Sequence, residues 1–321
     1  MQPINRAGIE AARERIAPHI RTTPTLSLER GAFSLQGFLV LKLELMQHTG
    51  SFKARGAFNR ILSCDVDHAG VVAASGGNFG VAVAYAAAKL DLPAEVFVPD
   101  TSSPVKVERL HALGADVQVV RGFYADALAA SEQRAAKTGA LFMHAYDQPE
   151  VVAGQGTVAA ELSRQTQAVD TVLVAVGGGG LIGGVASWFA GDVRVVGVEP
   201  VRAPTLTRAL EAGMPIDVEV SGLAADSLGA RRAGSIGFAA ARSFVERTIL
   251  VEDVAIADAQ RMLWHETRIV AEPGGAAALA ALTSGAYRPA ADEWVAVLVC
   301  GGNTDPALLS SGERLGSPAL P

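Results

Sequence analysis

One segment, residues 171–184, limits most strongly what this chain can fold into. It reads TVLVAVGGGGLIGG, an apolar run rich in valine that leads into four consecutive glycines and then into a second apolar stretch. The first run predicts a buried strand and the second a helix that continues to about residue 189. Glycines at such a turn let backbone N–H groups approach an anion, and the helix N-terminus adds partial positive charge. The segment therefore predicts a phosphate site between a strand and a helix.

Strand and helix patterns alternate along most of the chain. Strands are expected at 70–75, 94–99, 116–120, 171–176, 193–199 and 294–299, and helices at 79–90, 104–113, 125–137, 157–165 and 181–189. Short strands joined by helices form parallel sheets that are covered on both faces. We therefore expect an α/β fold of two doubly wound parallel-sheet lobes. Its active site should lie between the lobes, at the carboxyl ends of strands.

Composition excludes several classes of partner. Half of the 321 residues are apolar, yet no apolar run approaches the roughly 20 residues of a membrane span. The formal net charge is −6 without a basic stripe, so we expect no nucleic-acid partner and no membrane association. Residues 1–23 have a helix-like pattern and lack the apolar core of a signal peptide. Cys64 and Cys300 are too few for a disulfide framework, so we expect a soluble, cytoplasmic protein.

The glycine run fits two kinds of cofactor site. Gly178, Gly180 and Gly183 match the G-x-G-x-x-G fingerprint, and Glu199 follows about 20 residues later, where a ribose-binding acid belongs. An NAD-dependent oxidoreductase is therefore one hypothesis. A dinucleotide site does not account for two further glycine turns after strands, SGGN at 75–78 and CGGN at 300–303. One bound molecule that contacts all three turns would explain them together.

A fourth segment, SFKARGA at 51–57, makes the pattern specific. Taken alone, Lys53 would be interpreted as an ordinary helix-surface lysine. Together with GGGGL at 177–181, EPGGA at 272–276, CGGNTD at 300–305 and AGQGT at 153–157, the segment resembles the fold-type II pyridoxal-phosphate enzymes. The resemblance is to the serine/threonine dehydratase and serine racemase family in particular, from about residue 21 to residue 305. It implies a tryptophan synthase β-like fold, with a large cofactor-binding domain (1–66 and 148–321), a small domain (67–147) and a homodimer.

The resemblance implies a role for each motif residue. Lys53 should hold pyridoxal 5'-phosphate as a Schiff base, with Phe52 beside the ring. The other implied cofactor-binding residues are Asn78 at the ring hydroxyl, Cys300 at the pyridine nitrogen, Glu272, and the phosphate-binding backbone of Gly177, Gly178, Gly179, Gly180 and Leu181. The substrate is expected at Ser75, Gly76, Gly77, Asn78 and Phe79, with Ser75 as a second catalytic candidate.

These roles imply a β-elimination. The substrate amine releases Lys53, which then takes the Cα proton as a free amine in an apolar pocket. A neutral thiol at Cys300 cannot keep the ring nitrogen protonated, which favours direct loss of a leaving group at Cβ. We therefore expect a dehydratase (ammonia-lyase) that converts a 3-hydroxy amino acid such as L-threonine or L-serine to a 2-keto acid and ammonia. Serine racemase, 3-hydroxyaspartate dehydratase and phenylserine dehydratase are the alternatives within the family.

Three positions near the substrate turn depart from the family pattern. Gly76 stands where racemases of the family carry a serine, which disfavours racemisation because the second face of Cα lacks a proton donor. Phe79 and Val81 replace a histidine and a glutamine, and favour a pocket for a larger or less polar β-substituent. The segment 221–229 is expected to help line this pocket.

Two further departures concern regulation and metal binding. Many relatives bind a divalent cation at positions that correspond here to Glu199, Ala203 and Thr205. Threonine in place of the final acid weakens such a site, so we expect no metal. The chain stops soon after Asp305, so we also expect no C-terminal regulatory domain and no feedback inhibition.

Overall fold

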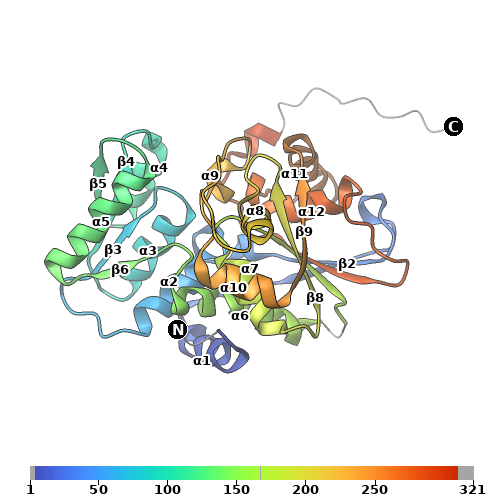
Figure 1. The fold of residues 1–321 in the computed structure, drawn as a ribbon, viewed down its shortest axis with the longest axis horizontal. Helices are drawn as coiled ribbons and strands as arrows, with labels where there is room; N and C mark the ends of the chain where they lie inside the picture. Colours follow the sequence, from blue (N-terminus) through green and yellow to red (C-terminus); the bar gives the residue numbers. More distant parts are fainter. Residues whose placement is uncertain (1–3, 167, 310–321) are drawn as a thin grey trace.

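Two separate sheets organise the chain in the computed structural model, which describes residues 4–166 and 168–309. The larger sheet has the order β1-β2-β10-β7-β8-β9, with β1 Thr25–Leu28, β2 Phe38–Lys42, β10 Trp294–Leu298, β7 Thr171–Ala175, β8 Arg194–Pro200 and β9 Val245–Val251. The smaller sheet has the order β5-β4-β3-β6, with β5 Asp116–Val120, β4 Ala94–Pro99, β3 Val71–Ala74 and β6 Leu141–Met143. Figure 1 shows the smaller sheet on the left and the larger one on the right.

Helices surround both sheets and join them. They are α1 Arg6–Ile16, α2 Lys53–Leu62, α3 Asn78–Lys89, α4 Pro104–Ala112, α5 Tyr124–Thr138, α6 Pro149–Gln165, α7 Gly180–Phe189, α8 Thr205–Ala212, α9 Ala225–Leu228, α10 Ser235–Phe244, α11 Asp253–Thr267 and α12 Pro273–Thr283. Short 3-10 turns lie at Ala17–His19, Ala32–Ser34, Glu44–Met46, His48–Gly50 and Pro306–Leu309. Helix α2 packs against α3 on one side and α6 on the other, so it lies where the two halves meet (Figure 1).

Local sequence explains where the main helices begin. Pro104, Pro149 and Pro273 occupy the first turn of α4, α6 and α12, where a missing N–H costs nothing because that group has no intrahelical acceptor. Helix α7 begins after Gly179, which has φ +91°. A left-handed conformation of this kind favours glycine. No helix in the described part of the chain is long and apolar enough to cross a membrane.

The predicted α/β architecture is confirmed, with three differences in detail. The neighbouring strands of both sheets are parallel except β1, which is antiparallel to β2. The helix expected at 157–165 begins at Pro149, so the AGQGT motif lies inside α6 rather than before it. Strands β1, β2, β6 and β9 and helices α8, α9, α10, α11 and α12 were not predicted.

The proposed domain division remains a prediction. The smaller sheet lies wholly within the proposed small domain of 67–147, and the larger sheet uses strands from both parts of the proposed large domain. Residues 1–3, 167 and 310–321 of that large domain lie outside the described residues.

Candidate active site

All the predicted cofactor-binding residues line one cavity of about 480 Å³ of open space. The residues are Phe52, Lys53, Asn78, Gly177, Gly178, Gly179, Gly180, Leu181, Glu272 and Cys300. They come from the start of α2, the start of α3, the β7–α7 turn, the start of α12 and the end of β10. Three of these segments follow the carboxyl ends of parallel strands, where α/β folds bind ligands.

The glycine turn after β7 leaves its backbone open to the cavity. A Cβ atom at Gly178 would collide with the ring of Tyr146, and one at Gly180 would lie 3.0 Å from the Tyr146 Cα. A Cβ at Gly177 would lie 3.1 Å from the Leu228 Cα. Side chains in this turn would therefore crowd Tyr146 and Leu228, so glycine allows these segments to pack closely against the turn. The first N–H groups of α7 have no intrahelical acceptor, so the turn and helix start suit a phosphate.

Lys53 extends into this cavity from the first position of α2. Its Nζ atom donates a hydrogen bond of 3.1 Å to the Ala145 carbonyl, and lies 5.1 Å and 5.6 Å from the ring centroids of Phe52 and Phe79. Burial lowers the pKa of the Lys53 amine to about 8, although the charges of Cys300 and Glu272 act in the opposite direction. A lysine with this pKa is accessible as a neutral nucleophile and base near physiological pH.

Cys300 follows β10 and is held as a neutral thiol. Its side chain is buried, and Sγ lies 3.4 Å from the Gly274 carbonyl that accepts its hydrogen bond. Burial raises the pKa of the Cys300 thiol to about 12, and the charge of Glu272 adds to this effect. A neutral thiol is a weak hydrogen-bond donor and carries no negative charge toward the cavity.

Glu272 and Asn78 form a polar pair in the lining of the cavity. Asn78 Nδ2 donates a hydrogen bond of 2.6 Å to Glu272 Oε1. Burial raises the pKa of the Glu272 carboxyl to about 7, although the Asn78 hydrogen bond and the charges of Arg109 and Lys53 lower it. The carboxyl therefore takes up a proton at a higher pH than an exposed glutamate does.

The predicted substrate turn is only partly within the lining of this cavity. Asn78 lines it, whereas Ser75, Gly76, Gly77 and Phe79 do not. The Gly77 N–H donates a hydrogen bond of 3.3 Å to Ser75 Oγ. A Cβ at Gly77 would lie 3.8 Å from the carbonyl oxygen of Asp226, so the turn faces the 221–229 segment.

The two apolar replacements near this turn have different surroundings. Phe79 is 2% exposed, but its ring lies beside the Lys53 amine. Val81 packs in the hydrophobic core that surrounds the smaller sheet, and it does not line the cavity. The suggestion that Val81 shapes the substrate pocket is therefore not supported, because its side chain faces the packed side of α3.

Seven residues that line the cavity were not among the predicted site residues: Tyr146, Ala175, Val176, Ile182, Ser227, Leu228 and Gly274. Ser227 and Leu228 belong to the 221–229 segment, and the Ser227 hydroxyl accepts a hydrogen bond of 3.1 Å from the Gly274 N–H. Tyr146, between β6 and α6, lies against the glycine turn, and its hydroxyl donates to the Arg232 carbonyl at 3.2 Å. No motif marks Tyr146, because its contact with Gly178 joins segments that are separate in sequence.

Glu199 serves the start of α8 rather than the cavity. Its carboxylate accepts hydrogen bonds from the Leu206 N–H (2.7 Å), the Thr207 N–H (2.8 Å) and the Thr207 hydroxyl (2.6 Å). Thr205, a second position of the family's cation site, donates to the Ala230 carbonyl at 2.6 Å. The ribose interpretation of Glu199 is therefore not supported. Within the described residues, no group of three or more His, Cys, Asp or Glu side chains could hold a metal ion.

We expect Glu199→Gln to weaken the pH dependence of stability. Burial raises the pKa of Glu199 to about 7 in the folded protein, above the value of about 4.3 for an exposed glutamate. The folded state therefore binds this proton more tightly, and the resulting stabilisation is complete at acidic pH and lost as pH rises through about 7. Between pH 5 and pH 8, the free energy of unfolding of the wild type should fall by roughly 2 to 3 kcal/mol more than that of the variant.

Denaturant unfolding at the two pH values measures this difference. Glu211→Gln, an exposed change in α8, the helix whose N-terminus Glu199 binds, is the matched control and should behave as the wild type. If the free energy of unfolding changes by the same amount between pH 5 and pH 8 in the wild type and in Glu199→Gln, Glu199 is ionised in the folded protein across this range.

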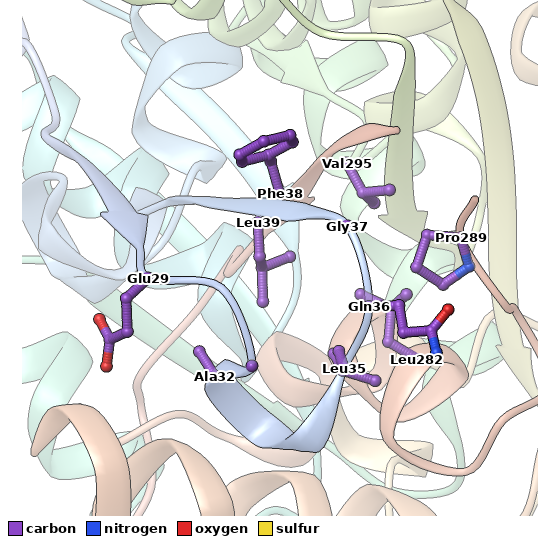
Figure 2. Close-up of a pocket in the computed structure, with 11 residues that line it drawn as sticks. Glu29, Ala32, Leu35, Gln36, Gly37, Phe38, Leu39, Leu282, Pro289 and Val295 are labelled. Atoms are coloured by element: carbon purple, nitrogen blue, oxygen red, sulfur yellow. The ribbon is translucent and has the colours of Figure 1, made fainter. Parts of the chain in front are cut away.

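A second hollow lies at the opposite ends of the strands (Figure 2). It is formed where β2 and β10 begin, beside Gly37 and Val295. Of the described residues that line it, only Glu29 and Gln36 have polar side chains. It therefore offers no cluster of catalytic groups, in contrast to the cavity around Lys53.

Comparison with known proteins agrees with this geometry. A family profile described as "Pyridoxal-phosphate dependent enzyme" matches residues 16–301. The chain is 36% identical over 317 residues to a phenylserine dehydratase from Ralstonia pickettii, covering 97% of this chain and 96% of the relative. It is 35% identical over 307 residues to an L-threonine ammonia-lyase from Geobacter sulfurreducens, covering 94% of this chain and 76% of the relative.

Comparison of the fold with solved structures points to the same family of proteins. The structure of maize serine racemase superimposes with a TM-score of 0.90 at 32% identity, covering 96% of each chain. The open glycine turn and the Lys53 amine in one cavity suit a phosphate-bearing aldehyde, which is the chemistry of the family's cofactor. This chain belongs to the family of pyridoxal-phosphate-dependent enzymes.

Proposed function

We propose that this protein is a dehydratase of 3-hydroxy amino acids that releases a 2-keto acid and ammonia. L-threonine and L-serine are its default substrates. One observation carries the proposal: the Lys53 amine, with its lowered pKa, shares a cavity with the neutral thiol of Cys300. The similarity to an L-threonine ammonia-lyase and a phenylserine dehydratase supports the same reaction class.

In this proposal some residues bind the cofactor and Lys53 also transfers a proton. Bound pyridoxal phosphate supplies an electron sink for the electron pair that the Cα proton leaves behind. Lys53 holds the cofactor and then takes the Cα proton at Nζ, since burial lowers its pKa toward neutrality. The thiol of Cys300 would lie toward the ring nitrogen and, because it does not ionise, would not hold that nitrogen protonated, which favours loss of the β-hydroxyl.

The remaining roles concern orientation. The N–H groups of Gly177, Gly178, Gly179, Gly180 and Leu181 would hold the phosphate, and Phe52 would lie beside the ring. Asn78 and Glu272, which are hydrogen-bonded to each other in the cavity lining, would hold the polar edge of the ring. Ser75 and the backbone of Gly76, Gly77 and Phe79 bind the substrate carboxylate at the N-terminus of α3.

A 3-hydroxy amino acid with a larger β-substituent is a second candidate for the substrate. Tyr146 and Leu228 add an aromatic and an apolar wall to the cavity. Such a lining favours an aryl group. The similarity to a phenylserine dehydratase points in the same direction.

A keto-acid release assay with four substrates tests the function. We expect 2-keto acid and ammonia in equal amounts from at least one of L-threonine, L-serine, 3-hydroxyaspartate and phenylserine. The substrate with the highest kcat/KM then decides between the two candidates. Absence of keto acid from all four substrates would contradict the proposal.

Chiral analysis of the serine reaction separates a dehydratase from a racemase. Gly76 supplies no hydroxyl to the second face of Cα, so we expect L-serine to yield pyruvate without appreciable D-serine. Formation of D-serine at a rate similar to that of pyruvate would favour serine racemase instead.

A cytoplasmic homodimer completes the proposal. Cys64 and Cys300 are both free thiols, which fits a reducing compartment. The dimer rests on the family resemblance alone. Light scattering of the purified protein should give twice the chain mass of 33.1 kDa.

A further inference from the structure

A chain of hydrogen bonds connects the last glycine turn to the wall of the cavity. Asn303 Nδ2 donates to the Thr49 carbonyl at 2.8 Å and to Asn78 Oδ1 at 2.6 Å. Asn78 Nδ2 in turn donates to Glu272 Oε1 at 2.6 Å. The path thus joins the loop before Lys53, the turn after β10 and the first residue of α3.

The direction of these bonds fixes the orientation of both amides. A backbone carbonyl can only accept, so the Thr49 carbonyl requires the NH₂ group of Asn303 to point toward it. The same NH₂ group then faces Asn78, which must present its oxygen. As a result, the NH₂ group of Asn78 points away from Asn303, toward Glu272. One of its two hydrogens serves Glu272, and the other is available to an acceptor in the cavity.

The backbone around this path leaves room for these side chains. Gly50 has φ +77°, and a Cβ there would collide with Asn303 Oδ1. A Cβ at Gly301 would collide with Glu272 Oε1. The Gly302 N–H donates to the Gly50 carbonyl at 2.9 Å, which holds the two loops together. Two glycines therefore stand where a side chain would displace Asn303 or Glu272.

The Thr49 carbonyl also accepts a second hydrogen bond, from the smaller half of the protein. Thr49 has φ +65°, a conformation that non-glycine residues rarely adopt. The Arg109 guanidinium from α4 donates to the same Thr49 carbonyl at 3.1 Å. The carbonyl that orients Asn303 is thus fixed by contacts from both halves of the protein.

We propose that Asn303 is a positioning residue that orients the Asn78 carboxamide so that its N–H group faces the ring hydroxyl of the cofactor. The inference rests on the cofactor contact proposed above for Asn78, and it extends the site by a residue that does not line the cavity. A donor aimed at that oxygen favours its ionised form, in which the bound cofactor absorbs visible light.

Asn303→Asp is the sharpest test because it keeps the shape and replaces the donor by acceptors. The carboxylate repels the Thr49 carbonyl and Asn78 Oδ1, so Asn78 turns its NH₂ group toward residue 303 and its oxygen toward the cavity. We expect cofactor affinity to fall by roughly ten- to a hundredfold. We also expect absorbance of the holoenzyme to move from the visible toward the near-ultraviolet. Asn5→Asp, at the N-cap of α1 where aspartate caps equally well, is the matched control and should leave both unchanged.

Asn303→Ala and Asn78→Ala separate positioning from simple structural support. If Asn303 acts through Asn78, adding Asn303→Ala to Asn78→Ala should not change cofactor affinity or absorbance further. Thermal unfolding of the cofactor-free variants checks that the fold is retained. Wild-type affinity and absorbance in Asn303→Asp, or additive losses in the double variant, would overturn the proposal for Asn303. A wild-type protein that releases no keto acid would instead contradict the proposed function, without bearing on these spectra.

Discussion

Lys53→Ala is expected to remove both cofactor colour and turnover. The side chain supplies the only amine proposed to hold the cofactor and to take the Cα proton, so its loss should lower kcat by roughly 10³-fold or more. Absorbance of the purified protein and a keto-acid assay measure the two effects. Lys53→Arg should be equally inactive, because a guanidinium retains the charge but cannot form the covalent link.

The lowered pKa of Lys53 also predicts how the rate of cofactor attachment depends on pH. Burial lowers this pKa to about 8, so the neutral amine increases about tenfold per pH unit below that value. The rate at which cofactor attaches to the cofactor-free protein should therefore rise from pH 6 to pH 8 and level off above it. Lys137→Ala, an exposed change on α5, serves as the control and should retain colour and turnover. Full activity of Lys53→Ala would refute the proposed mechanism.

Gly178→Ala is expected to cause the second-largest loss, through cofactor binding. The added methyl group would collide with the ring of Tyr146, so either the ring or the turn must move. Overpacking of this kind costs about 1 to 3 kcal/mol, and a displaced turn no longer presents its N–H groups to the phosphate. We expect cofactor affinity to fall by roughly ten- to a hundredfold, as measured by titration of the cofactor-free protein.

Two further variants show whether the contact with Tyr146 causes the loss of cofactor affinity in Gly178→Ala. Gly8→Ala on α1 introduces the same methyl group where the nearest neighbour is Asn5 Oδ1 at 3.5 Å, an ordinary contact. It should bind cofactor as the wild type does. Tyr146→Ala combined with Gly178→Ala removes the ring and should restore part of the lost affinity. If the double variant binds as weakly as Gly178→Ala, the methyl group disturbs the turn by another route.

Predictions from local patterns succeeded where neighbouring residues determine the structure. The alternation of apolar runs and glycine turns identified β3, β4, β5, β7, β8 and β10 to within one or two residues. It missed β1 and β2, since their pairing with each other and with β10 depends on distant segments. It also placed the start of α6 too late, although Pro149 is a typical first residue of a helix.

Local patterns were less informative about residues whose roles depend on burial. By spacing, Glu199 matched a ribose-binding acid, and it also corresponded to one position of a cation site that Thr205 weakens. Its carboxylate instead binds the N-terminus of α8, which only the folded chain brings within 2.8 Å of it. Val81 was read as part of the substrate turn, but the helical period of α3 directs it into the core.

The sequence by itself determined the family and the group of residues that line the cavity. Its motifs are short, and each requires a particular residue type for a local reason, such as a glycine at a crowded turn or an amine at the start of a helix. Only the tertiary structure decided how these motifs meet and which other residues join them. Tyr146 packs against the glycine turn, and Asn303 contacts Asn78, which is 225 positions away in the chain. Contacts of this kind leave no periodic or compositional signal, because they depend on how whole strands and helices pack.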